Sequence, residues 1–150
     1  MLRVSKLSDY ATVVLGHLAA APGRVRPAAD LAEAARLELP TVSKVLKLLG
    51  TAGLVESYRG VSGGYRLARP PAQISVAQIV EAIDGPIGMT ECAVHAGQCS
   101  HEVHCGVRGP WQRISEVVVR SLREMSLAEM IAPAPAPPPD DPARIAIRLA

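Results

Sequence analysis

Two short helical patterns followed at once by a glycine-rich hairpin, within residues 27–69, constrain the fold more than any other feature. The first pattern, PAADLAEAARLEL, is rich in Ala and Leu, and its acidic residues Asp30 and Glu33 lie in its first turns, where the helix dipole favours negative charge. Pro40 and Gly53 then stand where a second helix would begin and end. The spacing predicts two helices joined by a tight turn.

The second helix, expected over residues 40–52, has two chemically different faces. Apolar residues recur at i, i+3, i+4 and i+7, which is the spacing of one buried stripe: Val42, Val45, Leu46 and Leu49. The opposite side centres on Lys44, Lys47 and Thr51, with Thr41 and Ser43 at its flanks and Leu48 as an apolar exception. Such a helix fits a major groove, where the lysines would meet phosphates and Thr41 and Ser43 would reach base edges. A plain helical hairpin with a solvated lysine face is the alternative.

A two-stranded hairpin is expected directly after the second helix. A strand is predicted over residues 54–58, followed by a turn through three glycines and a return strand that includes Tyr65 and Leu67. Three arginines on this hairpin could lie along a phosphate backbone or enter a minor groove: Arg59, Arg66 and Arg69. The hairpin could also be only a structural lid. Together with the two helices it predicts a winged helix, and the arginines favour DNA as the partner.

The distribution of charge agrees with a polyanionic partner. Residues 1–69 carry 10 Lys and Arg against 5 Asp and Glu, whereas residues 70–150 carry 6 against 9. A basic first half favours binding to nucleic acid, although ordinary surface charge would give the same composition.

Three further helices are expected after the hairpin. Ser75 with Gln78, and Ser126 with Glu129, have the spacing of capping boxes and predict two helix starts. Between them, WQRISEVVVRSLREM predicts a long helix with an apolar stripe at spacings of 3 and 4: Trp111, Ile114, Val118, Leu122 and Met125. We expect this stripe to pack on a second copy of the chain in a homodimer; packing within one chain is the alternative.

All three cysteines lie within residues 91–105, ECAVHAGQCSHEVHC, together with three of the four histidines. The cysteines are Cys92, Cys99 and Cys105, so their spacing is C-x6-C-x5-C. Structural zinc sites generally have ligand pairs two to four residues apart, which these cysteines lack. Thiolates are the usual protein ligands of iron–sulfur clusters, which favours a cluster. The fourth ligand must then come from another side chain, a second protomer or a small molecule.

The two ends of the chain predict no membrane anchor. Asp9 and His17 interrupt the apolar stretch near the start, and no apolar run approaches the ~20 residues that span a bilayer. The odd number of cysteines also agrees with a cytoplasmic protein, since secreted chains usually pair them. Residues 132–150 are rich in proline and predict an extended, disordered tail, with a short helix over residues 144–150 as the alternative.

These motifs give the chain a resemblance to a known family, the IscR-like bacterial winged-helix repressors, which include iron–sulfur, nitric-oxide and cysteine-metabolism sensors. The resemblance covers residues 1–131 and rests on KLSDYA, LPTVSKVLKLLGTAGLVESYRGVSGGYRLAR, ISVAQIVEAIDGP and three cysteines before a long helix. The chain looks most similar to the repressors of the SUF iron–sulfur assembly operon. The resemblance implies a mainly α fold with a small two-stranded β wing, in which a winged helix-turn-helix precedes a long C-terminal dimerisation helix.

The resemblance also implies DNA-contacting residues. The helix over residues 40–52 would read the major groove and the wing the minor groove of a double-stranded operator. These roles fall to Thr41, Ser43, Lys44 and Lys47 on the helix and to Arg59 on the wing, beside Arg66, which the hairpin pattern already places there.

The cysteines are implied to hold an iron–sulfur cluster, either [2Fe-2S] or [4Fe-4S]. In the best-known member of the family a histidine lies three residues after the third cysteine, but Arg108 stands there in this chain and cannot ligate. In the nitric-oxide-sensing branch, an acidic residue matching Asp9 ligates the cluster of the opposite subunit. We therefore expect Asp9 of the other protomer as the first candidate, followed by His104 and then by His101 and His95.

The expected function is that of a homodimeric transcription repressor that senses iron–sulfur cluster status and regulates SUF-type assembly genes. Residues 1–70 would form the DNA-binding domain, residues 71–131 the cluster loop and dimerisation helices, and residues 132–150 the tail. A thiol-based or zinc-binding winged-helix regulator without a cluster is the alternative. An enzyme is not expected, because no base and orienting group accompany the cysteines.

Overall fold

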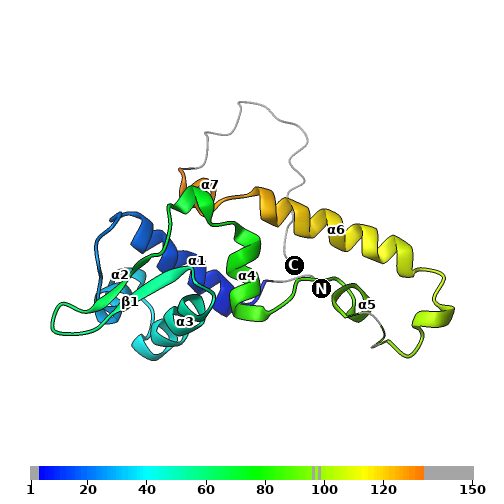
Figure 1. Cartoon of the computed structure of the whole chain (residues 1–150), viewed down its shortest axis with the longest axis horizontal. Helices are drawn as coiled ribbons and strands as arrows, with labels where there is room; N and C mark the ends of the chain where they lie inside the picture. The colour runs from blue at the N-terminus through cyan, green and yellow to red at the C-terminus, as the bar shows by residue number, and fades with distance from the viewer. Residues whose placement is uncertain (1–3, 96, 98, 134–150) are drawn as a thin grey trace, which may run out of the picture.

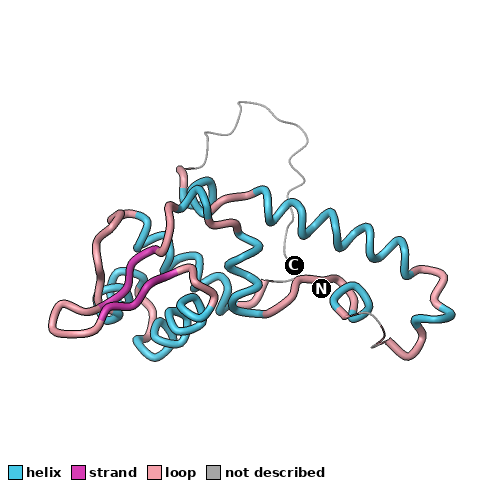
Figure 2. Tube along the Cα trace, viewed as in Figure 1, coloured by secondary structure: helices cyan, strands magenta, loops and turns pink. Residues whose placement is uncertain are grey.

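The computed structural model describes residues 4–95, 97 and 99–133 (Figure 1). The predicted mainly helical fold with a two-stranded wing is confirmed, and Figure 2 shows that helices form most of the described chain. In chain order the elements are α1 (Lys6–Ala19), α2 (Ala28–Ala35), α3 (Leu39–Thr51), β1 (Val55–Tyr58), β2 (Gly64–Leu67), η1 (Pro71–Gln73), α4 (Val76–Asp84), α5 (Glu91–Val94), η2 (Glu102–His104), α6 (Arg108–Glu124) and α7 (Leu127–Ile131).

Helices α2 and α3 form the predicted helix-turn-helix. The apolar stripe of α3 is fully buried as expected, and it packs against α1 and α2 around Leu15 and Leu31. Helix α3 begins at Leu39, one residue before Pro40, which is tolerated there because the first amides of a helix have no partner within it. The turn between the helices contains Arg36 with a φ of 54°, a left-handed conformation that is uncommon for residues other than glycine.

The wing is an antiparallel hairpin in which Val55 pairs with Leu67 and Tyr58 with Gly64. Its return strand is tied to the segment before α2, because Arg26 and Tyr65 exchange two backbone hydrogen bonds of 2.9 and 2.8 Å. A Cβ atom at Gly64 would collide with the backbone of Arg26. Glycine is therefore required where the wing meets the body.

Both predicted capping boxes are present. Ser75 accepts from the backbone amide of Gln78 at the start of α4, and Ser126 accepts from that of Glu129 at the start of α7. The two starts lie side by side, since Ser75 and Ser126 form a β-bridge. Leu127 is consequently buried in the same core as α1 and α3, which brings the end of the described chain back to its beginning.

The segment from α4 to α6 extends away from this body, and α6 runs back beside it toward α7 (Figure 1). The seventeen residues of α6 include one buried residue, Ser115. Apolar side chains on α6 are exposed by 41% at Trp111, 45% at Ile114 and 50% at Val117. Val118 and Leu122 instead line a hollow against the end of α4. The predicted stripe is therefore divided between a face that packs within the chain and a face open to solvent.

The predicted proline-rich tail lies outside the described residues from residue 134 onward. Within the described ranges, no helix is both long enough and apolar enough to span a bilayer.

Candidate nucleic-acid interface and cysteine segment

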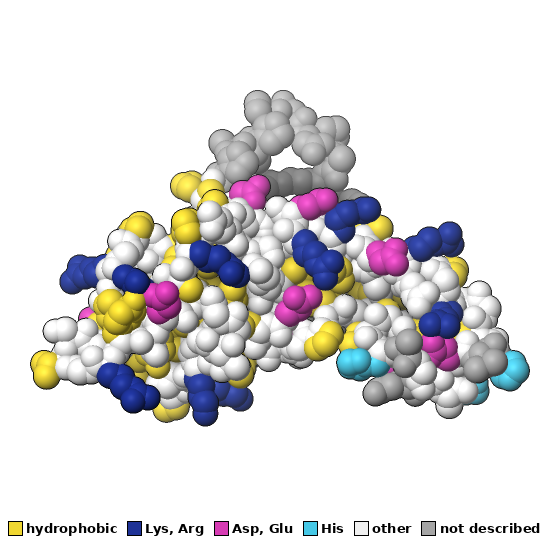
Figure 3. Space-filling view, viewed as in Figure 1, with side chains coloured by type: hydrophobic (Ala, Val, Ile, Leu, Met, Phe, Trp, Pro, Cys, Tyr) yellow, Lys and Arg dark blue, Asp and Glu magenta, His cyan; other side chains and the backbone are white. Residues whose placement is uncertain are grey.

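The outer face of α3 presents the predicted polar side chains. Ser43, Lys44 and Lys47 are exposed and Thr41 is half-buried. The hydroxyl of Thr51 donates a hydrogen bond of 3.0 Å to the carbonyl of Lys47, so this side chain is bound to its own helix. Lysine and arginine side chains are spread over the winged-helix end of the molecule in Figure 3. This end has the shape and charge of a surface for a polyanion.

A concavity separates α3 from the wing. Ser43 and Lys47 line it from α3, and Glu56, Tyr58 and Arg66 line it from the strands. The pattern in the sequence had placed Lys47 and Arg66 on separate elements, and the fold brings them to one hollow. A helix beside a hairpin with a hollow between them is the arrangement that straddles a nucleic-acid backbone.

The three arginines of the wing have different surroundings. Arg59 follows β1 directly and is exposed. Arg69 is half-buried, and its Nε atom is buried with no hydrogen-bond partner among the described residues. Arg66 is engaged within the wing, as described next. Residue type alone does not distinguish these three side chains.

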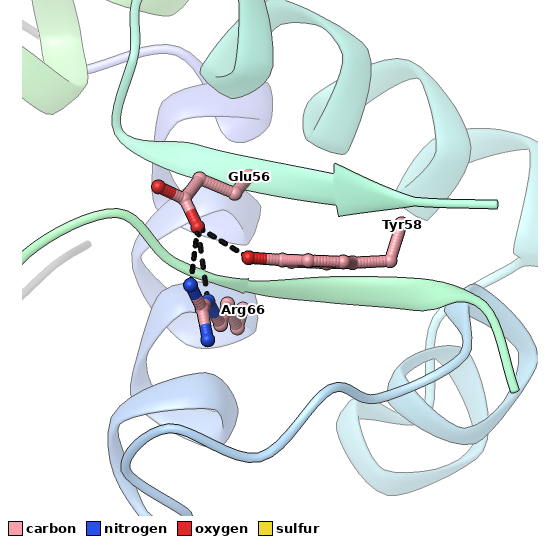
Figure 4. Close-up of polar contacts among 3 residues, drawn as sticks. All are labelled: Glu56, Tyr58 and Arg66. Carbon is pink, nitrogen blue, oxygen red and sulfur yellow. Dashed lines mark hydrogen bonds and ion pairs between the residues drawn. The ribbon is translucent and has the colours of Figure 1, made fainter.

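Arg66 forms a cluster with Glu56 and Tyr58 (Figure 4). Its Nε and Nη2 atoms both lie 2.9 Å from Oε2 of Glu56, and its guanidinium lies 4.8 Å from the centre of the Tyr58 ring. The Tyr58 hydroxyl donates to the same oxygen at 2.7 Å. These hydrogen bonds, first that of Tyr58 and then that of Arg66, lower the pKa of Glu56, and the bond to Glu56 raises the pKa of Tyr58.

Sequence reasoning missed Glu56 and Tyr58 as members of this surface. Glu56 and Arg66 are directly opposite in the hairpin register, and Tyr58 lies two residues along the same strand on the same face. An opposite-charge pair across two strands is a recognised stabilising contact. The register, once the glycine turn is counted, was the signal that could have revealed it.

The three cysteines are distributed along the segment between α4 and α6. Cys92 lies in α5, Cys99 in the following loop, and Cys105 directly after η2. All three thiols are free and half-buried. The hydroxyl of Thr90 and the sulfur of Cys92 are 3.3 Å apart. The segment therefore offers three free thiols within a short stretch of chain.

Three contacts anchor this segment. The amide of Met89 donates to the hydroxyl of the buried Ser115 on α6 at 3.1 Å. Glu102, whose side chain is 9% exposed, accepts from the amide of Gly97 at 2.5 Å and pairs with Arg108 at 2.6 Å. Arg108 thus holds the loop through Glu102. The position of Glu102 between two cysteines was visible in the sequence, but its inward orientation was not.

The donor set suits a thiolate-bound cluster by its chemistry, since three free thiols are available. Within the described residues, however, no three His, Cys, Asp or Glu side chains are gathered as a metal site. His95, His101 and His104 are exposed. To hold one cluster, the segment would have to draw its cysteines together.

Asp9 lies in the first turn of α1 and is exposed. It lines a groove shared with Val13 of the same helix and with Met130 and Ile131 of α7. Among the described residues, Asp9 and the cysteines of the same chain do not form a group that could bind a metal ion. Its neighbour Ser8 is buried and donates to Asp84 at the end of α4 at 2.8 Å, so the start of α1 is tied to the point where the cysteine segment departs.

Comparison with known proteins places these features in a family. Residues 4–133 match the Rrf2 family, described as iron-dependent transcriptional regulators. The HTH-type transcriptional regulator IscR of Cereibacter sphaeroides is 32% identical over 150 residues, which cover 91% of this chain and 94% of that protein. The IscR of Xenorhabdus nematophila is also 32% identical, over 105 residues that cover 70% of this chain and 63% of that protein.

Solved structures agree with this placement. CymR, the global cysteine regulator of B. subtilis, superposes with a TM-score of 0.69 at 26% identity, covering 87% of this chain and 97% of that chain. IscR of T. potens superposes with a TM-score of 0.66 at 27% identity, covering 87% and 86%. The winged-helix architecture with a long C-terminal helix is thus shared, and the family is one of regulators, not of enzymes. The chain belongs to the Rrf2 family of DNA-binding transcriptional regulators.

Proposed function

We propose that this Rrf2-family regulator is a homodimeric, cytoplasmic repressor that senses iron–sulfur cluster status and controls SUF-type assembly genes. One observation carries the proposal: three free, half-buried thiols lie in the short segment that joins the winged helix to α6. The description of the family as iron-dependent and the similarity to IscR proteins support it. A ligand bound in this segment would act on both of the elements that the segment connects.

Cys92, Cys99 and Cys105 would hold the cluster. Asp9 of the partner subunit is the first candidate for the remaining ligand and His104 the second. When bound, the cluster supplies a centre whose loss reports iron shortage or oxidation. Residues of the chain would position the loop around the cluster. Glu102 contacts Gly97 and Arg108, and Ser115 contacts Met89, so both ends of the loop are anchored.

The exposed face of α6 supports the homodimer. Trp111, Ile114 and Val117 form an apolar surface with Pro110, which a soluble chain would cover with a second copy. In a two-fold dimer, a shift of α6 changes the separation of the two α3 helices, and therefore their fit to two half-sites. Cluster occupancy regulates only if the two states differ in affinity for the operator.

On the DNA, α3 would enter the major groove and the wing would reach the minor groove. The proposed contacts are those of Thr41, Ser43, Lys44, Lys47, Arg59 and Arg66. We also propose the division of the chain into a DNA-binding domain over residues 1–70, a sensing and dimerisation region over residues 71–131 and a tail over residues 132–150.

Anaerobic purification with iron counting and absorption spectroscopy tests the ligand set, repeated for Asp9→Ala and His104→Ala. Asp30→Ala is the matched control, because Asp30 is also an exposed acid in the first turn of a helix. We expect Asp9→Ala to lose iron or change the spectrum and Asp30→Ala to leave both unchanged. An unchanged cluster in both Asp9→Ala and His104→Ala would refute the ligand assignment.

Titration of a duplex that carries a SUF-type promoter tests the sensing. We expect the apo and anaerobically reconstituted proteins to differ in affinity. Equal affinities would overturn the proposal that the cluster regulates DNA binding.

A thiol-based or zinc-binding regulator is the second candidate function. The free cysteines favour its thiol-based form, because in the described part of the chain they are not gathered as a metal site. The fold shared with a cysteine regulator also supports it. A colourless anaerobic preparation that contains zinc, or that forms a disulfide on oxidation, would select this function over the cluster sensor.

A further inference from the structure

Glu56 is an unusual residue for the surface on which it lies. From residue 39 to residue 69 the chain has two lysines, three arginines and a single acidic residue, which is Glu56. Among the residues that the structure describes, it is also the only acidic side chain that lines the concavity between α3 and the wing. A carboxylate at this place opposes the approach of phosphates, so a function for it must be found in what it contacts.

Glu56 contacts the one arginine that faces the same concavity. One carboxylate oxygen accepts from Nε of Arg66 and from the hydroxyl of Tyr58, and it forms an ion pair with Nη2 of Arg66. The guanidinium lies against the face of the Tyr58 ring (Figure 4). The Glu56–Arg66 pair has no net charge. The orientation of the Arg66 side chain is set by its contacts with the Glu56 carboxylate and with the Tyr58 ring. By contrast, the neighbouring Lys47 and Arg59 are exposed and have no such acidic partner in the described structure.

We infer that Glu56 is a specificity-determining residue that competes with DNA phosphates for Arg66 and so weakens binding to random DNA. The inference rests on the proposed contact of the wing with DNA. Binding to random sequence consists almost entirely of phosphate contacts, so withholding one cation removes one of them. Base contacts from α3 do not involve Arg66, so the operator loses a smaller share of its affinity.

The pair is weak enough to exchange. Its side chains are 39% and 45% exposed, and exposed ion pairs contribute little to stability because water and salt screen them. A phosphate held by α3 and Arg59 can therefore draw Arg66 away from Glu56. Glu56 therefore makes the contact between Arg66 and a phosphate less favourable without preventing it.

Fluorescence anisotropy of a labelled random-sequence duplex, measured with the full chain at several salt concentrations, tests the inference. In Glu56→Gln, Arg66 is free to bind a phosphate. We expect the slope of log affinity against log salt to become steeper by about 0.9, and the affinity at about 0.1 M salt to rise roughly 3- to 10-fold. The proteins are prepared in parallel, with equal iron content and equal circular dichroism.

Glu116→Gln is the matched control, since it removes the same charge from an exposed position on α6. It should leave the slope and the affinity unchanged. An equal gain in this control would show a general effect of net charge and would overturn the inference.

The double variant Glu56→Gln with Arg66→Gln identifies the route. If Glu56 acts through Arg66, the double variant loses the gain seen in Glu56→Gln. A retained gain would mean that the carboxylate only repels phosphates, and an unchanged slope in Glu56→Gln alone would also refute the inference. If no variant, nor the wild type, binds any duplex, the proposed DNA contact itself fails.

Discussion

The winged-helix body and the arm formed by α6 with the cysteine segment are built on different principles. In the body, side chains of α1, α2, α3, β1 and α7 meet in one core, and Val42, Val45, Leu46 and Leu49 are all inaccessible to solvent. In the arm, α6 has one buried residue, Ser115, and three large apolar side chains open to water. The body is complete within one chain, whereas the arm presents surfaces that a second chain or a ligand would complete.

The largest expected effect is a difference between the two regions in how much a substitution lowers the free energy of unfolding. Leu46→Ala in the body should lower the free energy of unfolding by about 2–5 kcal/mol, because it leaves a cavity in a packed core. Val107→Ala, at a position 57% exposed in the arm, should change it by less than about 0.5 kcal/mol. Urea denaturation followed by circular dichroism measures both, and similar losses would break the comparison.

The second effect concerns the open face of the arm. Ile114→Asp should weaken the proposed homodimer at least about a hundredfold, because burying an unpaired carboxylate costs several kcal/mol. Sedimentation velocity measures the dissociation, and Ile114→Leu is the control that keeps the face apolar. The body should stay folded in both variants. A dimer that survives Ile114→Asp would show that α6 is not the interface.

The third effect is local to the cysteine segment. Glu102→Ala removes the acceptor of the Gly97 amide and the partner of Arg108, interactions that together contribute about 1.5–3 kcal/mol. Hydrogen exchange at Gly97 should therefore accelerate more than tenfold while the core amides of α3 are unaffected. Glu91→Ala, which removes an exposed acid of the same segment, is the control. Protection of Gly97 that persists in Glu102→Ala would contradict the anchoring role.

The smallest effect lies at the surface of the body. The pKa of Glu56 is lowered from its ordinary 4.5, so the contribution of its contacts is fully present above pH 4.5 and is lost as the pH falls through the lowered value. The pKa of Tyr58 is raised above 10.0 by the bond to Glu56. In Glu56→Gln, NMR titration should find the Tyr58 pKa closer to 10. An unchanged Tyr58 pKa would mean that the cluster is not formed in solution.

The elements of the body were predictable because their signals are local. Capping residues lie three positions from their partners, as in Ser75 with Gln78, and the stripe of α3 repeats with the period of a helix. The short helices α5 and η2 were not predicted, since a single turn has too few residues for a periodic pattern. The first residues of α3 and β1 each differ by one position from prediction, because end residues depend on packing as well as on propensity.

The candidate sites divide in the same way. The polar face of α3 and the three cysteines were recognised from residue type and spacing, since these properties belong to the sequence. The pairing of Glu56 with Arg66 requires a register, and the contacts of Glu102 with Gly97 and Arg108 require a folded loop. Neither follows from residue type and helical or strand period alone.

The sequence by itself determined the winged helix, its basic surface and the presence of three thiols before a long helix, because each depends on periodicity, charge or composition within a short window. Only the tertiary structure decided which of the cations on that surface are free and which face of α6 is open. Those properties depend on which distant side chains come within a few ångströms of one another. Arg59 and Arg66 are alike in the sequence, and a carboxylate on the opposite strand makes them different in the protein.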